Sequence, residues 1–174
     1  MTTKRLMVSF VVLLVVCFCI MEVATPTGAE TLRWKNYSYV TKQETAPAGD
    51  VEGHFLGFST RRSFCILENG EIATASSVVT SDYIKGSGSA LQYTTMTFSD
   101  GSTIVMKLSY TSTGTGPGSR TSAQSTREII KGTGRFQGIT GTGTGITKYL
   151  PLEPGEAGQK GVGEFSITHT LPSK

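Results

Sequence analysis

The sequence carries little charge of either sign. Asp, Glu, Lys and Arg make up 17% of its 174 residues, and 16 basic against 13 acidic side chains leave a formal net charge of +3. Nucleic-acid-binding domains concentrate basic residues on one face, so this balance argues against a nucleic-acid partner. The length and the 37% hydrophobic content indicate a single packed domain and exclude a protein with several membrane spans.

Long apolar runs are also scarce, and the longest lies at the N-terminus. The run Leu6–Met21 follows the basic pair Lys4 and Arg5 and precedes the small residues Thr27-Gly28-Ala29. This order predicts a secretory signal peptide over residues 1–29, cleaved after Ala29. The alternative is a retained membrane anchor, although a run of about sixteen residues falls short of the ~20 that span a bilayer.

Cysteine is nearly absent from the remaining chain. Residues 30–174 contain only Cys65, so no disulfide can form within the predicted mature domain. A signal peptide implies a secreted or periplasmic protein with no membrane association after cleavage. Domains of this size can be stable without disulfides.

Alternation of apolar and polar residues dominates the chain after residue 30. Ser102–Thr111 and Val162–Leu171 each place their larger apolar side chains on one face, which predicts half-buried strands. Asn69-Gly70 and Asp100-Gly101 predict tight hairpins with type I′ turns. Thr111–Arg120 is predicted to be a flexible loop. Further strands are expected at Leu32–Thr41, Gly53–Thr60, Ser63–Leu67, Glu71–Thr80, Ala90–Phe98, Arg127–Lys131 and Gly143–Leu150.

Eight or nine short strands with no credible helix predict an all-β protein. We expect a single eight-stranded, antiparallel, up-and-down β-barrel of the calycin-like type over residues 30–174, because closure removes exposed strand edges. The interior of such a barrel can be filled by side chains or can hold one small ligand.

The segment Gly132–Gly145 is rich in glycine but does not fit a phosphate-binding loop. Neither GxxxxGK[ST] nor GxGxxG is present, so a nucleotide cofactor is not expected. We expect a sharp chain reversal in which Phe136 plugs one end of the barrel. The residues of this structural motif are Gly132, Gly134, Phe136, Gly138 and Gly141.

The run Ile129–Gly141 resembles the G-x-G-x-F-x-G-x-x-G signature of the allene oxide cyclase barrel-like family, which is related to the plant allene oxide cyclases and dirigent proteins. Gly49–Gly57, Asn69-Gly70-Glu71 and Gly163–Ile167 also fit bacterial members. The resemblance implies an eight-stranded barrel with an apolar cavity, and it implies that copies of the chain can form a homo-oligomer.

The resemblance also implies an activity, namely a cofactor-free isomerisation or cyclisation inside the barrel. Cys65 would stand at the family's cavity cysteine and Asn36 at its asparagine. The first expected strand, Thr31–Lys42, contains neither Asp nor Glu and so offers no match for the family's catalytic glutamate. The catalytic residues therefore stay unknown.

Several residues could carry chemistry. Asp50, Glu52 and His54 alternate and could form a metal or acid–base cluster, or simply an exposed strand end, and we favour the strand end because metal sites need three or four converging ligands. His169 and Cys65 are each either core residues or cavity residues. The predicted lumen residues are Trp34, Asn36, Cys65, Tyr93, Met106, Tyr110 and His169.

The leading functional hypothesis is an exported barrel that binds a small apolar molecule in its lumen, without metal or cofactor. One alternative is a cofactor-free isomerase or cyclase that uses the same cavity. The other is a filled barrel that acts only as a structural or interaction protein. The first two require an open lumen, and the third requires a packed one.

Overall fold

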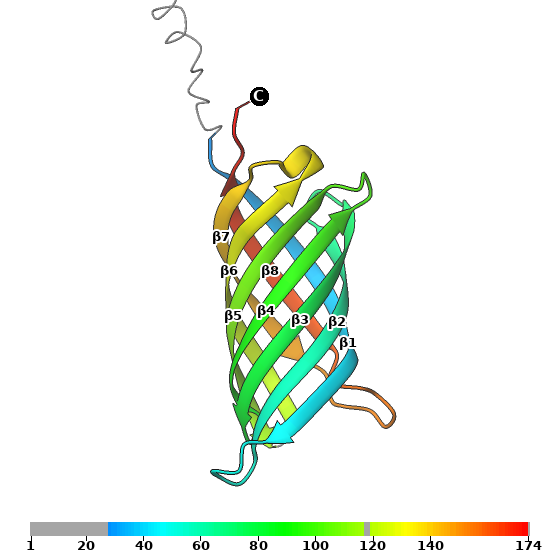
Figure 1. The fold of residues 1–174 in the computed structure, drawn as a ribbon. Helices are drawn as coiled ribbons and strands as arrows, with labels where there is room; N and C mark the ends of the chain where they lie inside the picture. Colours follow the sequence, from blue (N-terminus) through cyan, green and yellow to red (C-terminus); the bar gives the residue numbers. More distant parts are fainter. Residues whose placement is uncertain (1–27, 117–118, 174) are drawn as a thin grey trace, which may run out of the picture.

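A computed structural model describes residues 28–116 and 119–173, which form one closed antiparallel barrel in the order β1 to β8 (Figure 1). β1 pairs with β8 from Glu30↔His169 to Ser38↔Gly161, and this pairing closes the barrel. The predicted signal peptide lies almost wholly outside the described residues. The elements are β1 (Glu30–Pro47), β2 (His54–Leu67), β3 (Ile72–Ile84), β4 (Ser87–Phe98), β5 (Thr103–Gly116), β6 (Ser119–Thr133), the 3-10 helix η1 (Gly134–Phe136), β7 (Thr140–Tyr149) and β8 (Gly161–Thr170).

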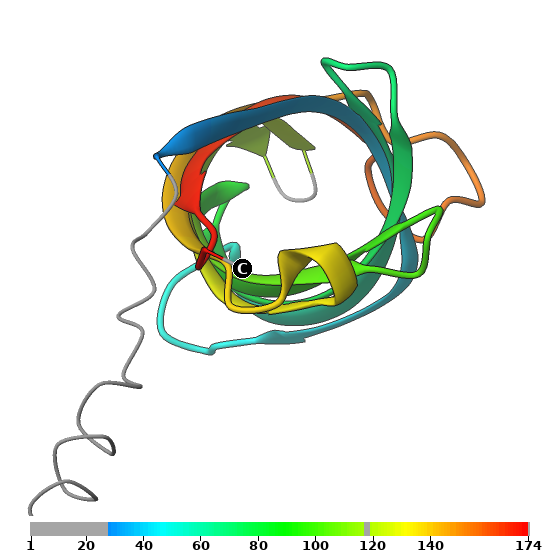
Figure 2. The same ribbon diagram turned by 90° about the horizontal axis from the view of Figure 1, so that it is seen from above.

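The two ends of the barrel differ. One end carries η1 together with the β2–β3 and β4–β5 hairpins, and we call it the closed end (Figures 1 and 2). The other end carries the β1–β2, β3–β4 and β7–β8 connections, and we call it the mouth. In the part of the chain that the structure describes, no helix has the length and apolar character needed to cross a membrane.

The expected barrel and both hairpins are confirmed, but the predicted turn type is wrong. Type I′ turns need positive φ at both central residues, and here only Gly70 (φ 84°) and Gly101 (φ 81°) are positive. Asn69 and Asp100 instead accept hydrogen bonds from the backbone N–H two residues ahead. The I′-like geometry occurs at the two-residue β3–β4 turn, where Lys85 (φ 49°) precedes Gly86 (φ 87°).

The predicted flexible loop at Thr111–Arg120 is also wrong. β5 continues to Gly116 and β6 begins at Ser119, with cross-strand pairs such as Ser112↔Ala123. The threonines and serines of this region suit exposed strands as well as loops, and hydrogen bonding to a neighbouring strand decides between the two. The barrel is therefore longer at its mouth than the sequence predicted.

On part of its inner wall the barrel carries glycines in place of larger side chains. In β7 the alternating Thr-Gly sequence turns its threonines outward and Gly141, Gly143 and Gly145 inward. A side chain on Gly145 would overlap the ring of Phe165 on β8. The glycines thus provide the space into which the large side chains of neighbouring strands pack.

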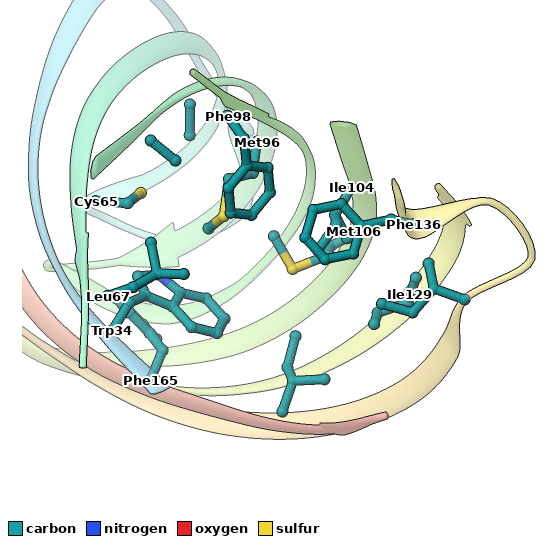
Figure 3. Packing of buried hydrophobic residues seen from close by; sticks show 14 of the residues in the cluster. Trp34, Cys65, Leu67, Met96, Phe98, Ile104, Met106, Ile129, Phe136 and Phe165 are labelled. Carbon is teal, nitrogen blue, oxygen red and sulfur yellow. The ribbon is translucent and has the colours of Figure 1, made fainter. Parts of the chain in front are cut away.

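The closed half of the barrel is solidly packed (Figure 3). Phe136 of η1 is buried with its ring centre 4.6 Å from that of Phe98, which confirms that it plugs this end. Trp34 lies against Phe165 with ring centres 5.5 Å apart. The same apolar core contains aliphatic and sulfur-containing side chains, including Cys65, Leu67, Met96, Ile104, Met106, Leu108 and Ile167. No ligand can enter from this end without displacing that core.

The packing of Phe165 on bare backbone predicts that Gly145→Ala lowers the free energy of unfolding by about 1–3 kcal/mol, because the added methyl group overpacks the wall. Urea unfolding followed by Trp34 fluorescence measures the change. Gly116→Ala is the matched control, since its added carbon meets open space and should change stability by less than about 0.5 kcal/mol. Equal midpoints for the two variants would contradict this account of the wall.

Candidate functional site: an arginine-lined lumen

The lumen becomes polar midway between the closed end and the mouth. A cavity of about 40 Å3 lies there, and a larger one of about 280 Å3 lies nearer the mouth. A third hollow of about 1240 Å3 is bordered mainly by strand residues such as exposed Thr80, Ser109 and Thr144, and it is a shallow depression of the outer surface. Only the first two lie inside the barrel.

Arg127 of β6 faces inward where the apolar core ends. Its guanidinium carbon lies 3.6 Å from the ring centre of Phe165 and 5.5 Å from that of Trp34. The residue is 8% exposed, and its Nε has no hydrogen-bond partner. Burial lowers the pKa of Arg127 to about 9, although Cys65 partly opposes this, so the side chain stays positively charged at neutral pH.

Arg61 of β2 lies further toward the mouth and is also buried. One of its terminal nitrogens donates a hydrogen bond of 3.1 Å to the backbone oxygen of Gln159, in the β7–β8 connection. Its guanidinium carbon lies 5.7 Å from the ring centre of Tyr149. A carbonyl and an aromatic face are neutral partners, so the positive charge of Arg61 has no counter-charge there.

Arg120 of β6 is the third inward-facing arginine and borders the mouth cavity. Its guanidinium carbon lies 4.5 Å from the centre of the Tyr149 ring and 5.4 Å from that of Tyr83. Gln159 fixes its backbone, accepting from the Arg120 N–H at 2.8 Å and donating to the Arg120 carbonyl at 2.9 Å. Burial lowers the pKa of Arg120, but Tyr149, Tyr83 and Tyr110 together outweigh this and raise it.

No carboxylate accompanies these three arginines. Within residues 28–116 and 119–173, every ion pair closer than 4.0 Å joins other side chains, and none involves Arg61, Arg120 or Arg127. The acidic residues of this part of the chain lie on the outer face or in the loops. The lumen is therefore a positively charged chamber in an otherwise nearly neutral protein.

Two further polar groups of the lumen lack partners. The Tyr110 hydroxyl and the Asn36 carbonyl oxygen both border the central cavity and form no hydrogen bond. Burial raises the pKa of Tyr110 far above its ordinary value, the neighbouring Tyr149 raises it further, and Arg61 lowers it. Tyr110 is thus a neutral hydroxyl that can donate a hydrogen bond to a guest.

The wall formed by β3 and β4 is polar, and its side chains pair with one another. Ser77 and Thr94 share a hydrogen bond of 2.8 Å, and the Gln92 amide donates to both, at 3.1 Å and 2.7 Å. This network belongs to β3 and β4 and borders the central cavity. The unpaired charge is therefore contributed by β2 and β6, which lie on opposite sides of the closed eight-stranded barrel.

The seven predicted lumen residues fall into three groups. Asn36 and Tyr110 border the central cavity. Trp34, Cys65, Met106 and His169 are inside the barrel but buried in the closed half, where the Nδ1 of His169 has no partner. Tyr93 lies on the outer face and is 47% exposed, so its prediction is wrong. Met96 and Phe98 point inward, and alternation then turns Thr94 inward and Tyr93 outward.

Cys65 is an inert core thiol in this structure. It is 1% exposed and lies between apolar side chains. Burial raises its pKa to about 11, with a smaller opposing effect of Arg127. A thiol with this pKa is almost fully protonated at neutral pH and is a poor nucleophile.

The structure brings together only part of the predicted Asp50, Glu52 and His54 cluster. His54 Nδ1 lies 2.6 Å from Asp50, and its Nε2 lies 2.7 Å from Asp82 of β3. These hydrogen bonds, first that to Asp82 and then that to Asp50, raise the pKa of His54. Glu52 is exposed, and the described residues contain no group of three or more side chains able to hold a metal ion. The cluster ties the β1–β2 loop to β3.

None of the three arginines is among the predicted lumen residues, although the sequence pattern turns two of them inward. Arg61 alternates with Ser63, Cys65 and Leu67, and Arg127 alternates with Ile129, so both fall on inward-facing positions. An arginine on the inner face of a barrel strand is itself a signal, because arginine is rarely buried without a partner. Alternation does not place Arg120, since the sequence predicts a loop at Thr111–Arg120.

Comparisons with known proteins find similarity among solved structures. No model of a protein family matches the chain, and no curated protein matches it. Among solved structures, the chain is similar to the pterocarpan synthase dirigent protein GePTS1 (TM-score 0.49, 17% identity, 84% of this chain and 92% of that chain). It is also similar to the pterocarpan synthase dirigent protein PsPTS1 (TM-score 0.48, 18% identity, 86% of this chain and 99% of that chain). Dirigent proteins are among the relatives named by the resemblance of the Gly/Phe segment.

An unpaired buried charge should cost stability, which predicts that Arg127→Met stabilises the empty barrel by about 1–3 kcal/mol. Methionine keeps an apolar stem against Phe165 and removes the guanidinium that has no counter-charge. Urea unfolding measures the effect, with Arg62→Met on the outer face as the control, expected within about 0.5 kcal/mol of the parent. A clear loss of stability in Arg127→Met would show that the charge is satisfied within the barrel.

Proposed function

We propose that the protein is an exported β-barrel that binds a small organic molecule in the mouth half of its lumen. The observation that carries this proposal is the cavity of about 280 Å3 at the mouth. Its wall combines apolar and aromatic surfaces, such as Val79 and Tyr83, with a few polar groups, such as Arg120 and Gln159. Small-molecule sites usually have this composition.

The contrast between the two halves of the barrel supports the location. The closed half is filled by its own side chains, and Phe136 blocks that end. The mouth half holds the smaller cluster Val79, Ala90, Tyr110 and Ala123, and it leaves space. A barrel that served only as a structural element would gain stability by filling this space with larger residues.

The side chains that line the mouth half narrow the kind of ligand that the sequence predicts. The mouth half offers guanidinium, hydroxyl and amide groups beside aromatic rings, so the ligand needs a polar group as well as an apolar body. No observation favours the cyclase alternative, because Cys65 lies in the packed core and borders neither inner cavity.

Export is supported by the N-terminal sequence. The basic pair, the apolar run and the small residues up to Ala29 match the three parts of a secretory signal. Mass spectrometry of the protein recovered from the medium or the periplasm should give a chain that begins at Glu30. A chain that begins at Met1 and stays in the membrane fraction would contradict export.

Filling the mouth cavity should abolish binding. Ser81 of β3 faces this cavity, so Ser81→Phe places a ring in the ligand space. The probe is N-phenyl-1-naphthylamine, a neutral compound whose fluorescence rises in an apolar site. We expect the purified protein to bind it and Ser81→Phe to lose at least about tenfold in affinity. Thr80→Phe, with its ring on the outer face, is the matched control. Binding that Ser81→Phe leaves unchanged, or that Thr80→Phe abolishes, would place the site elsewhere.

A further inference from the structure

Two of the lumen arginines, one bordering each inner cavity, share the same neighbours. Arg61 borders the central cavity and Arg120 the mouth cavity. Both guanidinium groups lie against the ring of Tyr149, at 5.7 Å and 4.5 Å from its centre, and both residues bond to Gln159. Two positive charges thus share one aromatic neighbour at the inner end of the proposed ligand space.

Hydrogen-bond donors surround this position. The buried hydroxyl of Tyr110 borders the central cavity without a partner, and the Tyr83 hydroxyl accepts a hydrogen bond of 3.4 Å from Arg120. Deeper in the lumen Arg127 adds a third positive charge, with its Nε unpaired. Donors and positive charge dominate the site, and no acidic side chain of residues 28–116 and 119–173 forms an ion pair with its arginines.

Like charges repel each other strongly in a buried site, and each buried cation loses the hydration that it would have in water. Proteins normally offset this cost with a carboxylate from the chain itself. Among the described residues no carboxylate offsets the cost here, and Gln159 and aromatic rings hold Arg61 and Arg120 in place instead. The missing negative charge is therefore expected to come from outside the chain.

We propose that the ligand of this barrel is an organic anion whose carboxylate binds between Arg61 and Arg120, with the Tyr110 hydroxyl as an additional donor. Arginine suits a carboxylate because its planar fork can donate two parallel hydrogen bonds. The apolar body of the ligand then lies in the mouth cavity, against Val79 and Tyr83. This inference rests on the proposed function, since it names the chemical class bound by the same lumen.

Two probes of nearly equal shape separate charge from shape. 2-Naphthoate carries a carboxylate, and 2-naphthamide replaces it with a neutral amide. Isothermal titration calorimetry with the purified protein should show 2-naphthoate binding at least about tenfold more tightly than 2-naphthamide. Equal affinities would overturn the anionic ligand and leave lumen binding intact, whereas no binding of either probe, together with none of N-phenyl-1-naphthylamine, would overturn both.

Substitutions of single arginines then test which side chains cause the preference for the anionic probe. Arg61→Met and Arg120→Met should each weaken 2-naphthoate binding about tenfold or more and leave 2-naphthamide binding within about threefold of the parent. Arg61→Lys keeps the charge and should retain most of the preference for the anion. Circular dichroism checks that each variant keeps the barrel.

The matched control is Arg62→Met, which removes the same charge from the next residue of β2 on the outer face. It should leave the preference unchanged. An equal loss in Arg62→Met and Arg61→Met would show that 2-naphthoate responds to the net charge of the protein, and the proposed position of the carboxylate would then be wrong.

Discussion

The central constraint on this structure is a lumen that holds three arginines, two of them buried, for which the described residues supply no negative charge. Arg61, Arg120 and Arg127 face the lumen, and the described residues place no carboxylate near them. Such an arrangement opposes folding, so the rest of the barrel must be stable enough to tolerate it. Proteins keep such costs at places where binding needs them.

The stability comes from the closed half. There the inner faces of all the strands except β7 carry side chains that meet in one apolar core, and Phe136 covers its end. Because β7 has glycines on its inner face, Phe165 can pack directly against Gly145, and the Phe165 ring in turn contacts the Arg127 guanidinium. A chain of contacts thus leads from the Thr-Gly repeat, through one aromatic ring, to the first charge of the lumen.

The mouth half is built for space and polarity. Its inner side chains are smaller or hold fixed hydrogen bonds, as in the network of Gln92, Ser77 and Thr94. Gln159 reaches in from the β7–β8 connection and positions both Arg61 and Arg120. A residue from a loop therefore sets the geometry of the site, while the strands set its walls.

The sequence predicted the barrel well because strand periodicity and hairpin signals are local. It also predicted the role of Phe136 as a plug and the inward direction of Tyr110. The prediction that Tyr93 faces the lumen failed because neighbouring side chains on a strand point to opposite faces, so an error of one position turns an outward residue inward. The sequence could not place Gln159, since the partners of that residue are far away in sequence and are brought to it only by the closure of the barrel.

The most direct test of the charged lumen is to observe the arginine side chains themselves. NMR resonances of the Nε–H groups can be followed while 2-naphthoate is added, with Arg62 on the outer face as the internal reference. The account predicts large, saturable shifts for Arg61 and Arg120 and almost none for Arg62. Shifts confined to outer-face arginines, or unchanged Arg61 and Arg120 resonances in a protein saturated with the anion, would contradict it.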